Sequence, residues 1–178
     1  EGYYYDAGSG SYTINVEFQG NTPPASSTGI SLTLGSLVSE SIDTSGEQDS
    51  YAFTLGSASN LYFDSLSADG SFHWTLAGPA GKAVSERSFT SSDWFASLQG
   101  LLGLPAGDYA LTIAASGDMT GAYSFRLSDL ASASVLAPGA PESGTLSPQN
   151  ATNAYRFAAG AGDRFFFDVQ ASSGVGST

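Results

Sequence analysis

Apolar and polar side chains alternate along most of the chain, which is the pattern of a β-strand with one buried face. The alternation is clearest in residues 12–18, 72–76, 109–113 and 123–127. The spacing of an amphipathic helix is almost absent, and only residues 92–99 offer a helical turn, with Ser92 or Asp93 as its cap. We therefore predict an all-β fold.

The segment 72–76 shows what the alternation implies for single residues. Phe72, Trp74 and Leu76 alternate with His73 and Thr75. Because successive side chains of a strand point to opposite faces, we expect Trp74 in the core and His73 on the other face of its sheet. Glycine-containing turn sequences separate the alternating segments at the intervals of an antiparallel β-sandwich.

The chain repeats itself at an offset of 104 residues. Residues 51–64 align with residues 155–168 without a gap, and the same offset aligns residues 32–42 with residues 136–146. The identical pairs of the first alignment are Tyr51/Tyr155, Phe53/Phe157, Gly56/Gly160, Phe63/Phe167 and Asp64/Asp168. This self-similarity indicates a structural unit of about a hundred residues that occurs in tandem.

A second alignment has a longer offset. Gly10-Ser-Tyr-Thr-Ile-Asn-Val resembles Gly121-Ala-Tyr-Ser-Phe-Arg-Leu 111 residues later, so the connection after the first copy is seven residues longer. The extra residues contain a Pro pair and small polar residues, which is typical of a linker. We predict four parts: the C-terminal strands of a preceding repeat (1–20), a linker (21–29), a complete sandwich repeat (30–130) and the N-terminal strands of a following repeat (133–178).

The complete repeat carries a series of turn and core motifs. They are Asp49-Ser-Tyr-Ala-Phe53, Leu61-Tyr-Phe-Asp64, Phe72-His-Trp-Thr-Leu76, Leu104-Pro-Ala-Gly-Asp-Tyr-Ala-Leu-Thr-Ile113 and Thr120-Gly-Ala-Tyr-Ser-Phe-Arg-Leu127. This series resembles the bacterial pre-peptidase C-terminal domain family. The resemblance implies jelly-roll-like β-sandwich modules, which occur behind secreted peptidases or in tandem in large secreted or surface proteins. The family often has an acidic residue two positions before the Tyr of its Tyr-x-Phe strand; Asp49 keeps it, and Asn153 does not.

Composition excludes several classes of function. The 178 residues include 17 Asp and Glu against 5 Lys and Arg, a formal net charge of −12. Five scattered cations cannot form the basic surface that a phosphate backbone or an anionic membrane requires, so we expect no nucleic-acid partner. No apolar run approaches the roughly 18 to 20 residues of a membrane span, so we expect no membrane insertion. The chain begins at Glu1 without a signal-type segment, so we expect it to be part of a longer protein.

Catalytic chemistry is equally restricted. The chain has no Cys and one His, which excludes thiolate nucleophiles and metal sites that need Cys or two imidazoles. A Ser-His-Asp arrangement would have to use His73, and no Gly-x-Ser-x-Gly elbow occurs. Short alternating strands with small turns do not indicate the deep cleft that a pair of catalytic carboxylates needs. We predict no catalytic residues and no enzymatic activity.

Three carboxylates lie within seven residues of a turn-like segment. Asp43, Glu47 and Asp49 surround Ser45-Gly46, and oxygen-rich loops that contain Gly can bind Ca²⁺. Their spacing is not that of an EF-hand, and the alternative is that they only solvate a turn. Calcium occurs in some members of the family that the chain resembles, so Ca²⁺ is a possible ligand although no cofactor is expected to be required.

Two other positions have a functional and a structural interpretation. Trp94 and Phe95 lie in a long connection outside the alternation, where exposed aromatic rings could stack on a sugar or contact a partner, or pack locally. Asp64 and Asp168 end an aromatic strand in both copies, so we expect these carboxylates to accept backbone N–H groups or to cap a turn.

These observations favour a non-catalytic structural or interaction repeat of a large secreted or cell-surface bacterial protein, such as a spacer, fibre or adhesin stalk. Its partners would be neighbouring repeats of the same chain, or other copies through strand pairing. The alternative is an accessory domain of a secreted enzyme, such as a peptidase, that binds polysaccharide or a protein fibre through Trp94 and Phe95. The low Lys content, the acidic charge and the lack of Cys suit an extracellular location.

Overall fold

The computed structural model of the chain describes residues 13–15, 29–93, 100–148 and 150–173. Regular structure in these residues is almost entirely strand, with two short 3-10 turns, η1 (Phe89–Ser91) and η2 (Leu130–Ser132). The strands are β1 (Ile30–Ser31), β2 (Leu37–Ile42), β3 (Gln48–Leu55), β4 (Ser59–Ser65), β5 (Phe72–Gly78), β6 (Gly81–Ser88), β7 (Leu101–Leu104), β8 (Gly107–Ala115), β9 (Gly121–Asp129), β10 (Ser134–Val135) and β11 (Tyr155–Arg156).

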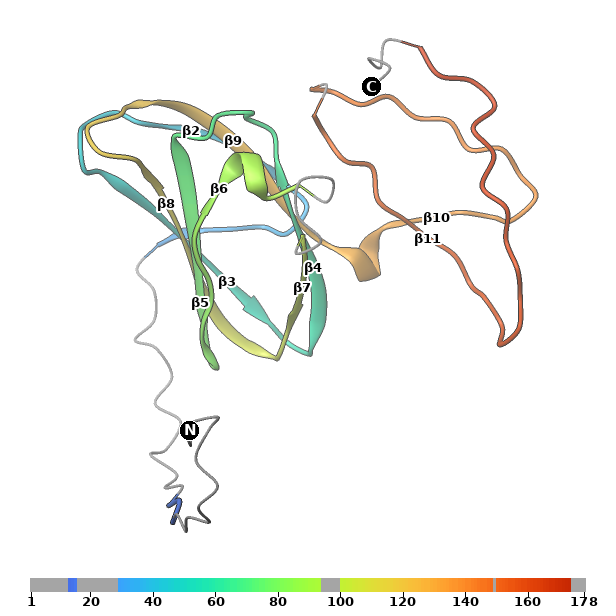
Figure 1. The fold of residues 1–178 in the computed structure, drawn as a ribbon, viewed down its shortest axis with the longest axis horizontal. Helices are drawn as coiled ribbons and strands as arrows, with labels where there is room; N and C mark the ends of the chain where they lie inside the picture. Colours follow the sequence, from blue (N-terminus) through green and yellow to red (C-terminus); the bar gives the residue numbers. More distant parts are fainter. Residues whose placement is uncertain (1–12, 16–28, 94–99, 149, 174–178) are drawn as a thin grey trace, which may run out of the picture.

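Strands β1 to β9 form a two-layer sandwich (Figure 1). One sheet has the order β1-β3-β8-β5-β6 and the other has the order β2-β9-β4-β7. All neighbours are antiparallel except β1, which pairs in parallel with β3. Apart from the β5–β6 hairpin, the connections from β2 to β9 cross from one sheet to the other, which is the connectivity of a jelly roll. The predicted all-β sandwich is confirmed.

The predicted alternation is confirmed in the strands that form the sandwich. In β5, Phe72, Trp74 and Leu76 are buried while His73 and Thr75 are partly exposed. The strands β8 and β9 repeat this pattern over their central residues. Each of these three strands therefore contributes one apolar face to the space between the sheets, as expected for a sandwich.

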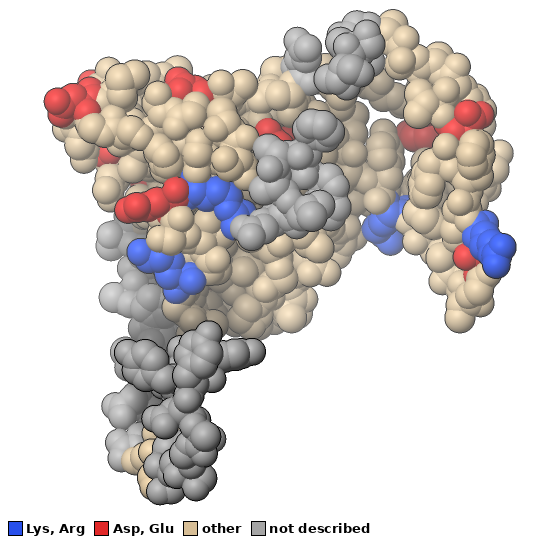
Figure 2. Space-filling model, viewed as in Figure 1, with Lys and Arg blue, Asp and Glu red and all other residues tan. Residues whose placement is uncertain are grey.

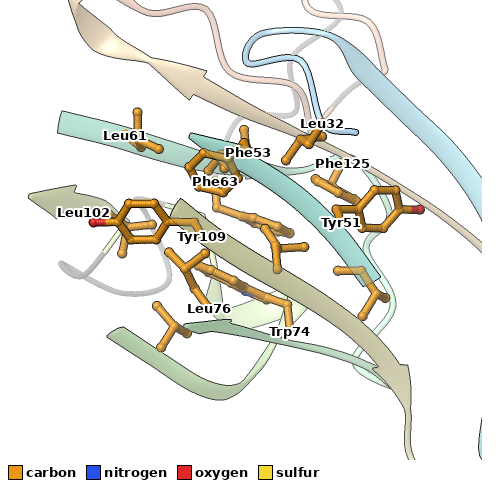
Figure 3. Close-up of a cluster of buried hydrophobic side chains, with 14 of the residues drawn as sticks. Leu32, Tyr51, Phe53, Leu61, Phe63, Trp74, Leu76, Leu102, Tyr109 and Phe125 are labelled. Atoms are coloured by element: carbon orange, nitrogen blue, oxygen red, sulfur yellow. The ribbon is translucent and has the colours of Figure 1, made fainter. Parts of the chain in front are cut away.

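Stacked aromatic rings fill this space (Figure 3). Phe63 of β4 lies against Trp74 of the opposite sheet at 4.1 Å between ring centroids with an interplanar angle of 6°, and against Phe125 of β9 at 5.1 Å. The indole N–H of Trp74 donates to the hydroxyl of Ser92 at 2.7 Å, and that hydroxyl donates to the carbonyl of Ser88 at 2.7 Å. The one polar atom of the buried indole is therefore satisfied, as a core tryptophan requires.

The helical turn expected at residues 92–99 lies largely outside the described residues. Ser92 and Asp93 are described as a turn and a bend without helix, and η1 comes before them, at Phe89–Ser91. None of the helical turns in the described part of the chain is long or apolar enough to cross a membrane.

Residues 133–173 lie beside the sandwich as long loops (Figure 1). In their described part, regular structure is limited to β10 and β11, which pair in parallel. The aromatic strand expected at residues 165–168 does not form. Its counterpart β4 pairs with β7 on one side and β9 on the other, whereas the described residues after Arg156 pair with no strand.

The strand predicted over residues 12–18 also lacks support in its described part. Residues 13–15 have no strand structure, and the side chain of Ile14 is 72% exposed. The other residues of this segment lie outside the described part of the chain.

Candidate functional site

The carboxylates considered for calcium lie at the turn between β2 and β3. Asp43 accepts a hydrogen bond from the hydroxyl of Ser41 at 2.7 Å. Oε2 of Glu47 accepts the backbone N–H groups of Asp43 at 2.7 Å and Thr44 at 2.9 Å. Glu47 therefore closes the turn by satisfying two backbone donors that no strand partner reaches.

Asp49 performs a different task on β3. Its carboxylate accepts the phenol O–H of Tyr123 at 2.5 Å, and the oxygen atoms of Tyr123 and Tyr51 are also 2.5 Å apart. Burial raises the pKa of Tyr123, and the hydrogen bonds to Asp49 and Tyr51 raise it further. Tyr123 therefore stays protonated and links β9 to β3 across the two sheets.

The structure does not bring Asp43, Glu47 and Asp49 to one point. Their hydrogen-bond partners are two hydroxyls, two backbone amides and a phenol, each consistent with holding the fold locally. Across the described residues, no three His, Cys, Asp or Glu side chains form a group that could hold a metal ion. The binding of Ca²⁺ here stays a prediction for experiment.

The expected aromatic binding residues Trp94 and Phe95 lie outside the described residues. The residue before them, Asp93, is described, and its carboxylate accepts the backbone N–H of Ser65 at 3.1 Å. Burial raises the pKa of Asp93 to about 6; the hydrogen bond from Ser65 lowers it and the nearby charge of Asp64 raises it.

An ion pair between a buried carboxylate and a partly exposed arginine forms on the outer face of the β2-β9-β4-β7 sheet. Because Phe63 points into the core, its neighbour Asp64 points to the other side of β4. Asp64 is directly opposite Arg126 of β9, and Nη2 of Arg126 donates to its carboxylate at 2.7 Å. The side chain of Asp64 is only 1% exposed, although this face of the sheet would be open in an isolated sandwich.

Residues 150–152 of the following segment cover this pair. The backbone N–H of Thr152 lies 3.2 Å from both oxygens of Asp64, and Arg126 donates to the carbonyl of Thr152 at 2.9 Å. The amide of Asn150 donates to the carbonyl of Ser65 at 2.7 Å. We call Asp64, Ser65, Arg126, Asn150 and Thr152 the junction, because they fasten the following segment to the sandwich.

An open cleft of about 610 Å³ adjoins the junction. Tyr62 and Arg126 line it from the sandwich, and Asn153 and Tyr155 line it from the following segment. Nε of Arg126 is buried and has no hydrogen-bond partner among the described residues. Figure 2 shows no continuous patch of either charge on the visible face.

Of the five junction residues, the sequence indicated only Asp64. The recurrence of Asp64 at Asp168 predicts a carboxylate that accepts backbone N–H groups, and the bond from Thr152 confirms this for Asp64. The donor is 88 residues away in the chain, so no local pattern identifies it. For Arg126, the sequence indicated only an outward position in an alternating strand and not its pairing with Asp64.

The structure also pairs a serine with the single histidine. The hydroxyl of Ser116 lies 3.2 Å from Nδ1 of His73, a contact that the sequence did not indicate. A catalytic serine needs a base that is itself oriented by a third group. None of the hydrogen bonds found among the described residues joins a carboxylate to this imidazole.

Comparison with known proteins finds folds but no family. No protein-family model matches the chain, and no curated protein matches it. Among solved structures, it is similar to PliG from Salmonella Typhimurium, a periplasmic lysozyme inhibitor of g-type lysozyme (17% identity, 57% of this chain, 97% of that chain, TM-score 0.43). It is also similar to the pre-peptidase C-terminal domain of collagenase from Bacillus anthracis (16% identity, 55% of this chain, 91% of that chain, TM-score 0.39). At such identities function does not transfer between chains.

The capping contacts of Glu47 lead to a test of the calcium prediction. We expect Glu47→Ala to lower the free energy of unfolding by about 1 kcal/mol, because two backbone donors lose their acceptor. The loss, measured by urea denaturation, should be the same with Ca²⁺ and with chelator. Glu40→Ala, which removes the same charge from an exposed strand position, is the control. If Ca²⁺ instead stabilises the wild type and not Glu47→Ala, the carboxylates bind the ion.

The junction makes a local prediction. Asp64→Ala removes the acceptor of the Thr152 N–H, so hydrogen exchange at this amide should become at least tenfold faster. The amide of Leu111 in the core of β8 should change far less, which separates local release from global unfolding. Asp43→Ala, which loses one exposed hydrogen bond, is the control. Equal exchange of Thr152 in all three proteins would contradict the proposed role of Asp64.

The raised pKa of Asp93 gives a pH dependence. Because the folded protein binds this proton more tightly than the unfolded chain, stability falls as pH rises from the ordinary value of 3.8 to about 6. Asp93→Asn keeps an acceptor for Ser65 and removes the charge. We expect it to be more stable than the wild type at pH 8 and equally stable at pH 3. The check is a series of denaturant curves across this range, in which parallel profiles for the two proteins would contradict the assignment.

Proposed function

We propose that the chain is a non-catalytic structural segment of a tandem array in a large secreted or cell-surface protein, in which each sandwich holds the next one in a set orientation. The observation that carries this proposal is a backbone pattern that occurs twice. At an offset of 104 residues, the β1–β3 pair and the β10–β11 pair have the same register, and several backbone hydrogen bonds and one glycine conformation also correspond.

The strand pairing is the first part of this pattern. In the sandwich, Ile30 is opposite Tyr51 in a parallel pair. In the following segment, Ser134 is opposite Tyr155, again in parallel. The next backbone hydrogen bond also corresponds. The N–H of Leu32 donates to the carbonyl of Ala52, and the N–H of Leu136 donates to the backbone carbonyl of Arg156, both at 2.8 Å. Two parallel strands cannot be joined by a tight hairpin and need a longer connection between them. The recurrence of such a pair in the same register therefore supports a repeated unit.

The turns that follow are the second part. Gly35 has φ +83° and Gly139 has φ +87°, a region that L side chains rarely adopt. The backbone bond from the N–H of Glu47 to the carbonyl of Thr44 at 3.1 Å has its counterpart in the bond from the N–H of Ala151 to the carbonyl of Pro148 at 2.9 Å. The two segments therefore have the same backbone hydrogen bond and the same glycine conformation at corresponding positions, although many of their side chains differ.

The junction supports a set orientation between units. The connection from β9 to β10 is short, and its turn η2 is capped by Asp129, whose carboxylate accepts the N–H of Ala131 at 2.9 Å. The ion pair of Asp64 and Arg126 then binds Thr152 on the other side of this connection. A covalent link and a separate polar contact together restrict rotation more than either does alone.

The proposed location outside the cell is supported by composition. The net charge of −12 favours solubility beside negatively charged surfaces, and the lack of Cys suits a fold that does not depend on disulfide formation.

An extended chain tests the repeat directly. Residue 178 corresponds to residue 74 at the 104-residue offset, so residues 75–130 are appended after residue 178. We expect the appended strands to complete a second sandwich, seen as added β-structure by circular dichroism and as burial of the Phe167 side chain by hydroxyl-radical footprinting. The same appended residues in scrambled order are the control. If the ordered extension leaves Phe167 as exposed as the scrambled one does, residues 133–178 are not the start of a repeat.

A further inference from the structure

Three consecutive residues of the following segment, Asn150, Ala151 and Thr152, meet the sandwich in three different ways. We call residues 150–152 the docking tripeptide. Thr152 is held through its backbone: its N–H lies 3.2 Å from both oxygens of Asp64, and its carbonyl accepts from Arg126 at 2.9 Å. Because main-chain groups make these contacts, position 152 requires an N–H, which Pro lacks, more than it requires a particular side chain.

Position 150 is held through its side chain. The carboxamide of Asn150 donates to the carbonyl of Ser65 at 2.7 Å. Strand β7 pairs with β4 over Ser59–Tyr62, so the backbone of Ser65 lies beyond that pairing. The carboxyl group of Asp93 already accepts the N–H of Ser65 at 3.1 Å. A side chain at position 150 must therefore donate a hydrogen bond, which an ionised carboxylate cannot do.

Position 151 is restricted by size and by charge. Ala151 is 8% exposed, so a long side chain would have to displace the atoms that cover the alanine. The peptide between residues 151 and 152 carries the N–H that Asp64 accepts. An acidic side chain here would bring a second negative charge close to Asp64, whose buried charge is already paired with that of Arg126.

The complete sandwich carries a different tripeptide at the corresponding place. At the 104-residue offset, residues 150–152 correspond to Gly46, Glu47 and Gln48. Gly46 and Gln48 are exposed in the sandwich, so a completed following unit would still present the docking tripeptide at its surface. The sequence Gly-Glu-Gln fails two of the three requirements, because Gly has no side chain to donate and Glu is long and charged.

We infer that this sandwich selects the unit that follows it through the docking tripeptide, an inference that rests on the proposed array. It accepts a unit with a hydrogen-bond donor at position 150 and a small uncharged residue at position 151, and it rejects a unit with the tripeptide of residues 46–48. Two units like residues 30–130 therefore cannot follow one another through this contact. Unlike units then take a set order in the array, because each junction discriminates against the wrong follower.

An isosteric substitution in the full 178-residue chain tests position 150. Asn150→Asp replaces the donor to Ser65 by a carboxylate that is charged at neutral pH. After correction for intrinsic rates, we expect hydrogen exchange at the amide of Thr152 to become at least tenfold faster. Asn153→Asp is the matched control, because the carboxamide of Asn153 contacts the carbonyl of Thr145 in its own segment.

Spin labels test position 151 by measuring the orientation of the following segment. The chain has no Cys, so Lys82→Cys in the sandwich and Glu142→Cys in the following segment, both at exposed positions, carry the labels. We expect a narrow distance distribution in the otherwise unchanged chain and with Ala151→Ser, and a clearly broader one with Ala151→Glu. Ala158→Glu, which adds the same charge at an exposed alanine of this segment, is the control.

Three results would overturn the inference. They are equal exchange of Thr152 in Asn150→Asp and Asn153→Asp, an unchanged distance distribution with Ala151→Glu, and exchange at Leu111 in the core of β8 that accelerates as much as exchange at Thr152. If the extended chain completes its second sandwich while Ala151→Glu keeps the narrow distribution, the array stands and only the selection of the follower fails. A broad distribution without any change at position 151 would contradict both the set orientation and the selection.

Discussion

The stacking of Phe63 between Trp74 and Phe125 is the contact on which the other features depend. It joins β4 and β9 of one sheet to β5 of the other at the centre of the core. Because side chains of a strand alternate, holding Phe63 inward places Asp64 on the outer face of β4. The position of the most deeply buried carboxylate in the described structure thus follows from the packing of its neighbour.

A carboxylate in that position constrains whatever covers it. Burial of a charge is unfavourable unless the charge is paired and hydrogen-bonded, and breaking such a pair costs more than the pair contributes net. Arg126 supplies the positive charge that pairs with Asp64. The backbone N–H of Thr152 donates to Asp64, and the carbonyl of Thr152 accepts from Arg126. The sandwich and the following segment therefore depend on the same three residues. This dependence supplies a physical basis for the proposed array, in which one unit would orient the next.

Much of the fold could be predicted from the alternation of apolar and polar residues, because a strand of a sandwich buries one face whichever strand it pairs with. Phe72, Trp74 and Leu76 are buried as expected, and His73 is not. Alternation failed where the partner strand is missing: the aromatic residues 165–168 have the same pattern as β4 but form no strand among the described residues. A strand pattern states which face would be buried, and pairing decides whether the strand exists.

Sequence by itself determined the all-β class, the inward and outward residues of the paired strands, the 104-residue repetition and the role of Asp64 as an acceptor. These are local or periodic properties, readable from the order of residues. Only the tertiary structure decided what each polar group meets. Asp43, Glu47 and Asp49 are close in the chain, yet a turn and a strand direct them to different partners. Asp64 and Thr152 are far apart in the chain, yet they share a hydrogen bond. Contacts between distant residues depend on how two sheets and a connection are placed in space, which no local pattern records.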